Sequence, residues 1–298
     1  MRRAALLMGA AAALSAAPAF ATDVTIRDFV GTVMLVEGSD GVELIEQGRK
    51  GDVDFRDSPS GIVVDGGMDN RARNDACKGR GVSFDLDWNG RDYAGDTRLA
   101  DYPKLRIGVP SGSDLTIESS AVRLETDVAL DRAELDLSGC FDVALADTTA
   151  VRLDKSGSGD FTAANVGTFT AEKSGSGDIE LKRVGRFDLE QSGSGDVEID
   201  LITGRADIEK SGSGNIEIVE VDGDFEVEKS GSGDVVIDGG EIPNLVVRNS
   251  GSGDVDIAAT VGNAYVRASG AGDVTLGRLT GSIDQRASGS ADINWDTD

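Results

Sequence analysis

The sequence contains no histidine, only two cysteines and five prolines, and 5% aromatic residues. Without histidine, neither Ser-His-Asp nor Cys-His catalysis is available, and the commonest zinc ligand is missing. Two cysteines alone cannot build a structural zinc site. We also expect a non-enzymatic protein that carries no cofactor, because the acidic residues recur uniformly and no copy is singled out as a catalytic site.

Basic residues are also scarce. The chain has 29 lysines and arginines against 54 acidic residues, which gives a formal net charge of -25. A field of this sign repels nucleic acids and anionic surfaces, so we expect no nucleic-acid partner. Polycations and divalent ions are more natural partners, but we favour a plainer interpretation, in which the charge keeps a flat-sided protein soluble.

Long apolar runs are missing after the N-terminus. Residues 1–21 have the features of a secretory signal peptide: a basic start at Met1-Arg2-Arg3, an alanine-rich apolar run, and a small-residue cleavage site that ends at Ala21. We expect cleavage after Ala21 and an exported chain with no membrane span.

The two cysteines, Cys77 and Cys140, are expected to form a disulfide, because an oxidising compartment favours pairing. Two independent buried thiols are the alternative. The polar stretch from Arg71 to Lys78, which leads into and past Cys77, is expected to be a loop.

A five-residue motif, Ser-Gly-Ser-Gly-Asp, recurs through the second half of the chain. Exact copies begin at Ser156, Ser174, Ser192, Ser230 and Ser250, and close variants begin at Ser211, Ser269 and Ser288. Successive copies are 18 to 20 residues apart. A near-constant period of this length is typical of solenoid proteins.

Apolar residues alternate on both sides of each motif, which is the period of a β-strand. A glycine between the two apolar runs marks a turn, for which we expect positive φ angles. Stacked copies then form two apolar columns, one from Phe161 to Ile293 and one from Val151 to Ile283. These features predict an all-β fold, a parallel β-helix or β-solenoid with two short strands in each repeat of about 19 residues. We expect a right-handed coil. A series of antiparallel hairpins is disfavoured by the constant period.

The chain is expected to have three parts: the signal peptide at 1–21, an irregular β part or cap at 22–101, and the regular solenoid at 102–298. Within the regular part, the stretch from Leu105 to Ile117 is expected to form the first coil.

Two rows of charged residues follow from the repeat. The first lies two residues before each motif and changes sign along the chain, as Asp154, Glu172, Glu190, Glu209, Glu228, Arg248, Arg267 and Arg286. We interpret it as a solvated face, with a polarised binding strip as the alternative. Its acidic part predicts weak Ca²⁺ binding through carboxylate oxygens. The adjacent Lys155, Lys173, Lys210 and Lys229 are expected to offset part of the acidic repulsion.

The second row is the last residue of each motif, Asp or Asn. A hydrogen-bonded turn residue is the favoured interpretation, because Asp and Asn commonly accept bonds from turn N–H groups. A calcium ladder of the β-roll type is disfavoured, since the spacing matches that motif poorly.

The segment Asp28-Phe29-Val30-Gly31-Thr32-Val33, the strand end Val109-Pro110 and the repeated Ser-Gly-Ser-Gly-Asp-Val-Glu-Ile units together resemble the head GIN domain family of auto-transporter adhesins. The resemblance implies an exported β-helix-like fold and an adhesive or cell-envelope role, with an envelope or surface ligand, carbohydrate or protein, as partner. A carbohydrate-active β-helix that acts on acidic polysaccharide is the alternative function. The sequence after the last motif leaves no room for a membrane barrel, so we expect a periplasmic location before an extracellular or surface one.

Overall fold

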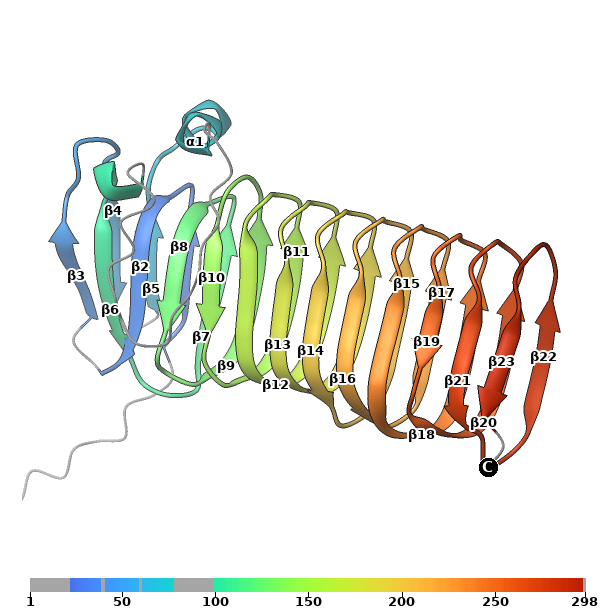
Figure 1. Cartoon of the computed structure of the whole chain (residues 1–298). Coiled ribbons are helices and arrows are strands. Elements are labelled where there is room, and N and C mark those ends of the chain that lie inside the picture. The colour runs from blue at the N-terminus through green and yellow to red at the C-terminus, as the bar shows by residue number, and fades with distance from the viewer. Residues whose placement is uncertain (1–21, 39–40, 59–60, 78–98, 297–298) are drawn as a thin grey trace, which may run out of the picture.

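The computed structural model describes residues 22–38, 41–58, 61–77 and 99–296. Strands make up 64% and helices 2% of the structure, and the chain winds into a β-solenoid of about 10 turns, about 19 residues apart. The predicted fold class is confirmed. Figure 1 shows the coils side by side in a rod, which runs from β3 (Gly41–Glu46) to β22 (Ile283–Ala287) and β23 (Ile293–Asp296). The handedness of the coil stays a prediction.

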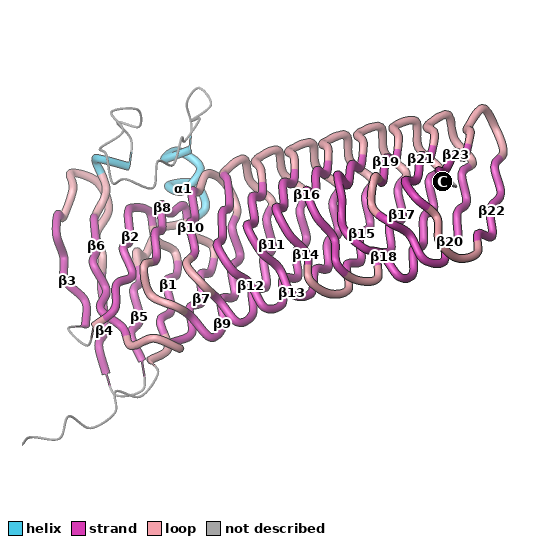
Figure 2. The backbone as a smooth tube through the Cα atoms, turned by 60° about the horizontal axis from the view of Figure 1, so that its bottom comes forward, coloured by secondary structure: helices cyan, strands magenta, loops and turns pink. Residues whose placement is uncertain are grey.

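Each coil contributes one strand to each of two parallel ladders. The pre-motif ladder holds the strands that lead into the motif, in the spatial order β5 (Gly61–Asp65), β1 (Val24–Arg27), β7 (Ser113–Glu118), β9 (Leu130–Leu137), β11 (Thr148–Lys155), the second halves of β12 (Asp160–Lys173) and β13 (Ile179–Gln191), β15 (Ala206–Lys210), β17 (Phe225–Lys229), the second half of β18 (Val235–Asn249), β20 (Thr260–Ala268) and β22. Figure 2 shows the two ladders joined by turns along the rod.

The post-motif ladder holds the strands that follow the motif. Its spatial order is β6 (Lys104–Val109), β2 (Val30–Glu37), β8 (Ala121–Thr126), β10 (Asp142–Leu145), the first halves of β12 and β13, β14 (Val197–Ile202), β16 (Ile216–Asp222), the first half of β18, β19 (Val255–Ile257), β21 (Val274–Arg278) and β23.

The hydrophobic core lies between the two ladders. Neighbouring coils pair in register, so both predicted apolar columns are confirmed: Phe161 pairs with Ile179, and Phe169 pairs with Phe187. The rings of Phe169 and Phe187 stack with their centroids 5.7 Å apart and an interplanar angle of 8°. Alternation places one side of every strand in this core, and burial of those side chains in successive coils stabilises the rod.

The coil order near the N-terminus differs from the expectation. Leu105 to Ile117 does not form one coil, because β6 and β7 belong to different coils. The strands β1 and β2 form a coil that lies between them: β1 pairs with β5 and β7, and β2 pairs with β6 and β8. The start of the described chain is therefore inserted as an inner coil, which sequence order alone does not reveal.

Antiparallel strands cover the outer edges of the first coil. β3 pairs antiparallel with β6, and β4 (Asp54–Ser58) pairs antiparallel with β5. Open strand edges are sites of unwanted pairing, and repeat proteins cover their ends with irregular structure. β3 covers the end of the post-motif ladder, and β4 covers the end of the pre-motif ladder.

The stretch expected as a loop contains a helix, α1 (Asn70–Cys77). Alanine and arginine are good helix formers, which explains why this polar segment is helical. Ala76 is buried together with Tyr102 and Leu99, the first residue of the short 3₁₀ helix η1 (Leu99–Asp101), against Val30 and Ala121. The helix thus packs on the turns of the first coils, as Figure 1 shows.

The expected positive φ angles are absent at glycines between the apolar runs, for example Gly167 and Gly185. The motif glycines Gly157 and Gly175 do not have positive φ angles either. Instead, a Cβ atom on Gly175 would overlap the carbonyl oxygen of Gly157 in the preceding coil. The turn backbones stack so closely that no side chain fits between them, and glycine permits this close approach.

Candidate functional site

The first charged row forms one continuous line on the pre-motif ladder. In-register pairing stacks its residues in the order Asp154, Glu172, Glu190, Glu209, Glu228, Arg248, Arg267 and Arg286. All of these side chains are exposed except Arg267, which is half-buried. We call this line the charged row. It is acidic over five coils and basic over the next three, as the repeat predicted.

A shallow groove of about 350 Å³ runs beside the acidic part of the charged row. Its lining combines those carboxylates with the first serines of the motifs and with three residues that lie between them in the chain, as Asp154, Glu172, Glu190, Glu209, Glu228, Ser174, Ser192, Ser211, Ser230, Ser250, Lys173, Gln191 and Lys210. The groove presents carboxylate and hydroxyl oxygens at regular spacing, so it offers hydrogen-bond acceptors to a cationic or hydroxyl-rich partner.

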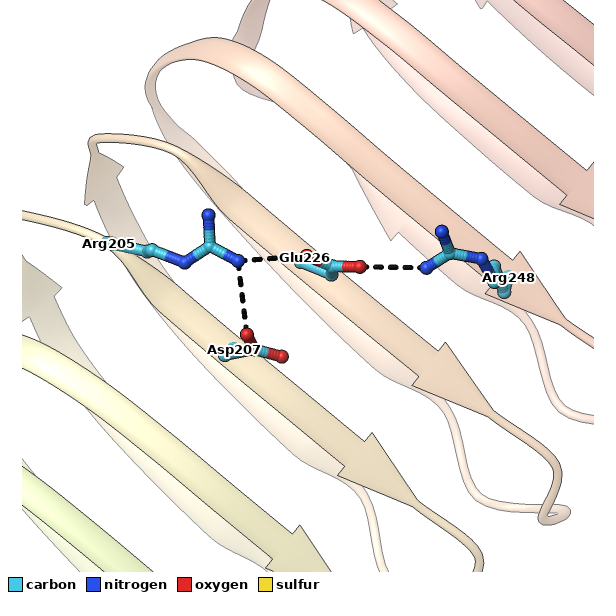
Figure 3. Close-up of polar contacts among 4 residues, drawn as sticks. All are labelled: Arg205, Asp207, Glu226 and Arg248. Atoms are coloured by element: carbon cyan, nitrogen blue, oxygen red, sulfur yellow. Dashed lines mark hydrogen bonds and ion pairs between the residues drawn. The ribbon is translucent and has the colours of Figure 1, made fainter.

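The change of sign is bridged by a small ion-pair network, which Figure 3 shows. Arg205 lies 3.1 Å from Asp207 and 2.9 Å from Glu226, and Arg248 lies 2.7 Å from the other oxygen of Glu226. The hydrogen bond from Arg248 is the main reason why the pKa of Glu226 is lowered. The network spans three coils and fixes the Arg248 guanidinium at the start of the basic part.

An aromatic side chain lies within the basic part. Tyr265 is 36% exposed, and the guanidinium carbons of Arg267 and Arg248 lie 3.9 Å and 5.6 Å from the centroid of its ring. Arg267 also pairs with Asp284 at 3.1 Å. Stacked guanidinium and phenol groups are a frequent feature of recognition surfaces. The repeat did not single out Tyr265, because only its neighbours in space give it this setting.

The row of motif Asp and Asn residues holds neighbouring turns together. The Asp160 carboxylate accepts a hydrogen bond of 2.9 Å from the Asp178 N–H of the next coil, and the Asp178 carboxylate accepts one of 2.8 Å from the Asp196 N–H. The same contact recurs through Asn215 to Asp292. The interpretation as hydrogen-bonded turn residues is confirmed, and Asn215 fits it as well as aspartate does.

The four lysines beside the acidic row are buried rather than exposed. Lys155, Lys173, Lys210 and Lys229 are 0 to 2% exposed. The alternation of the strand continues through them, so that each acidic residue points outward and the following lysine points into the turn. Whether they offset part of the acidic repulsion from this buried position stays a prediction.

The buried lysines share one column with two carboxamides. The order is Lys155, Lys173, Gln191, Lys210, Lys229 and Asn249, which we call the inner polar column. Its nitrogens donate to carbonyl oxygens of the motif glycines, for example from Lys155 to Gly177 at 2.5 Å and from Lys210 to Gly212 at 3.0 Å. Burial lowers the pKa of Lys155 and of Lys173 to about 8. Counting by two from the apolar columns could have revealed this placement.

Cys77 and Cys140 form a disulfide that ties α1 to the turn before β10. Close to it, Asp142 is 2% exposed, and burial raises the pKa of its carboxyl to about 6. Asp142 pairs with Asp160, so it is the first member of the motif Asp row, preceded by the degenerate copy Ser138-Gly139-Cys140. The Arg123 guanidinium lies 3.7 Å from it.

The remaining predictions concern the signal peptide, metal binding and membrane spans. Ala21 and the rest of the predicted signal peptide lie outside the described residues. Among residues 22–38, 41–58, 61–77 and 99–296, no group of three or more His, Cys, Asp or Glu is arranged to hold a metal ion. Weak Ca²⁺ binding along the acidic part of the charged row stays a prediction. In the part of the chain that the structure covers, no helix is long and apolar enough to cross a membrane.

Among known proteins, the chain is similar to one described family. No curated protein and no solved structure matches the chain. One family model matches residues 91–240 and 219–297, which include the regular coils and the whole charged row. The adhesin-like family and the solenoid fit a non-enzymatic, adhesin-like role. The chain belongs to the family described as "putative auto-transporter adhesin, head GIN domain".

Proposed function

We propose that the protein is an exported, non-enzymatic, adhesin-like solenoid of the cell envelope that holds a carbohydrate or protein partner along its charged row. The observation that supports this most directly is the change of sign along one exposed line, from five acidic to three basic residues. The coils are in register, so successive charges are about 4.8 Å apart, the separation of paired strands. An extended partner therefore meets a fixed order of charges on a rigid support.

The two ends of the charged row suit different groups of such a partner. The acidic end borders the groove with its serine hydroxyls, and the basic end carries Tyr265 between Arg248 and Arg267. Charge order of this kind governs which partner binds and in which direction more than it raises affinity. We place the protein in the periplasm first and at the cell surface second, because residues 1–21 have the features of a signal peptide.

Two measurements test this proposal. Fractionation of the producing cells into cytoplasm, periplasm, outer surface and medium tests export, and a cytoplasmic protein would contradict it. Binding of the labelled protein to purified envelope polysaccharide and to intact cells tests the charged row. We expect Glu190→Lys with Glu209→Lys, and separately Arg267→Glu with Arg286→Glu, to weaken binding.

The control for the charge changes is on the other ladder. Glu198 and Glu217 are exposed on the post-motif ladder, so Glu198→Lys with Glu217→Lys changes the net charge as Glu190→Lys with Glu209→Lys does, without touching the charged row. Equal loss of binding in this control would show a net-charge effect and overturn the assignment to the row. An assay on uronic-acid polymers tests the enzymatic alternative, and sustained cleavage would replace the proposal.

A further inference from the structure

The inner polar column repeats one combination of side chains, two lysines followed by a carboxamide. Each of its two pairs of lysines is followed, one coil later, by a carboxamide: Lys155 and Lys173 by Gln191, and Lys210 and Lys229 by Asn249. In both places the last lysine and the amide donate to the same carbonyl oxygen, that of Gly195 in the first and that of Gly253 in the second.

We propose that Lys229 and Asn249 form an intramolecular isopeptide bond. In this step the Nζ–Cγ bond forms and the Cγ–Nδ2 bond of the asparagine breaks. The proton lost from Nζ is delivered to Nδ2, which leaves as ammonia. Nothing is oxidised or reduced, and no co-reactant is consumed. The product is a secondary amide that joins β17 to β18 inside the turn. This inference does not depend on the proposed function.

The two reacting groups are held side by side. Lys229 and Asn249 are direct partners in the parallel pairing of β17 with β18. Lys229 Nζ lies 2.5 Å and Asn249 Nδ2 lies 3.0 Å from the Gly253 oxygen, so the two nitrogens are separated by no more than the sum of these distances, 5.5 Å. The shared carbonyl oxygen keeps the amine and the carboxamide in one buried place, and proximity of this kind favours an intramolecular reaction.

The lysine has the properties of a nucleophile. Its side chain is 0% exposed, and burial, followed by repulsion from Lys210, lowers its pKa to about 8. A larger fraction of the amine is therefore unprotonated near neutral pH than for an exposed lysine. The charges of Asp234 and Asp254 act in the opposite direction and favour the ammonium form.

The asparagine carbonyl is polarised. Asn249 is 1% exposed, and its Oδ1 accepts a hydrogen bond of 3.0 Å from the Gly251 N–H. A backbone N–H at this position stabilises the negative charge that develops on the oxygen when Nζ attacks Cγ. The Gln191 carbonyl has no such donor, because its buried Oε1 has no hydrogen-bond partner. We therefore expect the bond at Lys229 and Asn249 but not at Lys173 and Gln191.

Mass spectrometry of the purified full chain tests the proposal. After reduction and denaturation, we expect the intact mass to be lower, by one ammonia, than the mass calculated for the observed N-terminus. Trypsin should then fail to cleave after Lys229, and peptide 211–248 should appear covalently joined to peptide 249–267. Fragmentation should locate the link between Lys229 and Asn249.

Three variants complete the design. Lys229→Arg and Asn249→Ala should each restore the full calculated mass, whereas Gln191→Ala should keep the deficit. A full mass in the wild-type chain, with 211–229 and 249–267 recovered as linear peptides, would overturn the proposal without reference to any variant. Loss of ammonia without a cross-link would also overturn it, since this indicates cyclisation of the asparagine alone. A second link at Gln191 would overturn the argument from carbonyl polarisation.

Discussion

Glu172 and Lys173 are consecutive in the chain but lie on opposite sides of one strand. Glu172 is exposed in the charged row, whereas Lys173 is 1% exposed and donates from its Nζ to the Gly195 carbonyl oxygen inside the turn. The two charges therefore do not form an exposed pair. Glu172 instead lies 3.6 Å from the Arg152 guanidinium, and the lysines are held by backbone carbonyl oxygens, which is how a buried charge is tolerated.

This arrangement predicts that stability depends on pH through the buried lysines. The pKa of Lys173 falls from its ordinary value of 10.5 to about 8 because of burial. Between these values the unfolded chain binds more protons than the folded one, so the free energy of unfolding should rise with pH. The contribution is present above pH 10.5 and is lost as the pH falls through about 8.

Melting temperatures measured between pH 7.5 and 10 check this dependence. Lys173→Met should flatten the rise with pH, because it removes one titrating group and keeps the length of the side chain. Lys182→Met, in which an exposed lysine of β13 is changed, is the matched control and should keep the wild-type slope. Identical slopes in all three proteins would show that Lys173 titrates as an ordinary lysine.

The strand register predicts a large difference between two nearby positions in β17. Phe225 is 1% exposed within the apolar column, so Phe225→Asp buries a carboxylate without a partner and should destabilise the protein by several kcal/mol. Glu228→Ala, at an exposed position of the same strand, should change stability by less than about 0.5 kcal/mol. Thermal or urea unfolding measures both. Equal effects would mean that the register of β17 is wrong.

The disulfide predicts a loss of stability on reduction. Cys77 and Cys140 are 63 residues apart, and a loop of this size allows a stabilisation of up to about 4 kcal/mol in the chain-entropy model. We expect the exported protein to contain the bond and Cys140→Ser to lower the melting temperature. Peptide mapping under non-reducing conditions decides the first point, and two free thiols in periplasmic protein would contradict it. A reductant should lower the melting temperature of the wild type but not of Cys140→Ser.

The acidic part of the charged row predicts weak binding of Ca²⁺. Its carboxylates are stacked in successive coils, and oxygen ligands suit this ion, so the cation can bridge neighbours. Without a dedicated loop, Kd should be on the order of 10⁻⁴–10⁻³ M. Calorimetry measures it, and Glu190→Gln with Glu209→Gln should weaken the binding. Submicromolar affinity would reveal a true site, and no heat at millimolar Ca²⁺ would leave the row as a solubility feature.

The sequence by itself determined the solenoid, its period and the order of charges along the charged row. Each of these depends only on which residues recur at equal spacing, and in-register stacking converts equal spacing into columns. The tertiary structure decided the features that do not follow from equal spacing in the sequence. It placed the coil of β1 and β2 between the coil of β5 and β6 and the coil of β7 and β8, because pairing between segments far apart in the chain does not have to follow chain order. It also placed Lys229 and Asn249 on one carbonyl oxygen inside a turn, a contact that depends on how closely the glycine backbones stack.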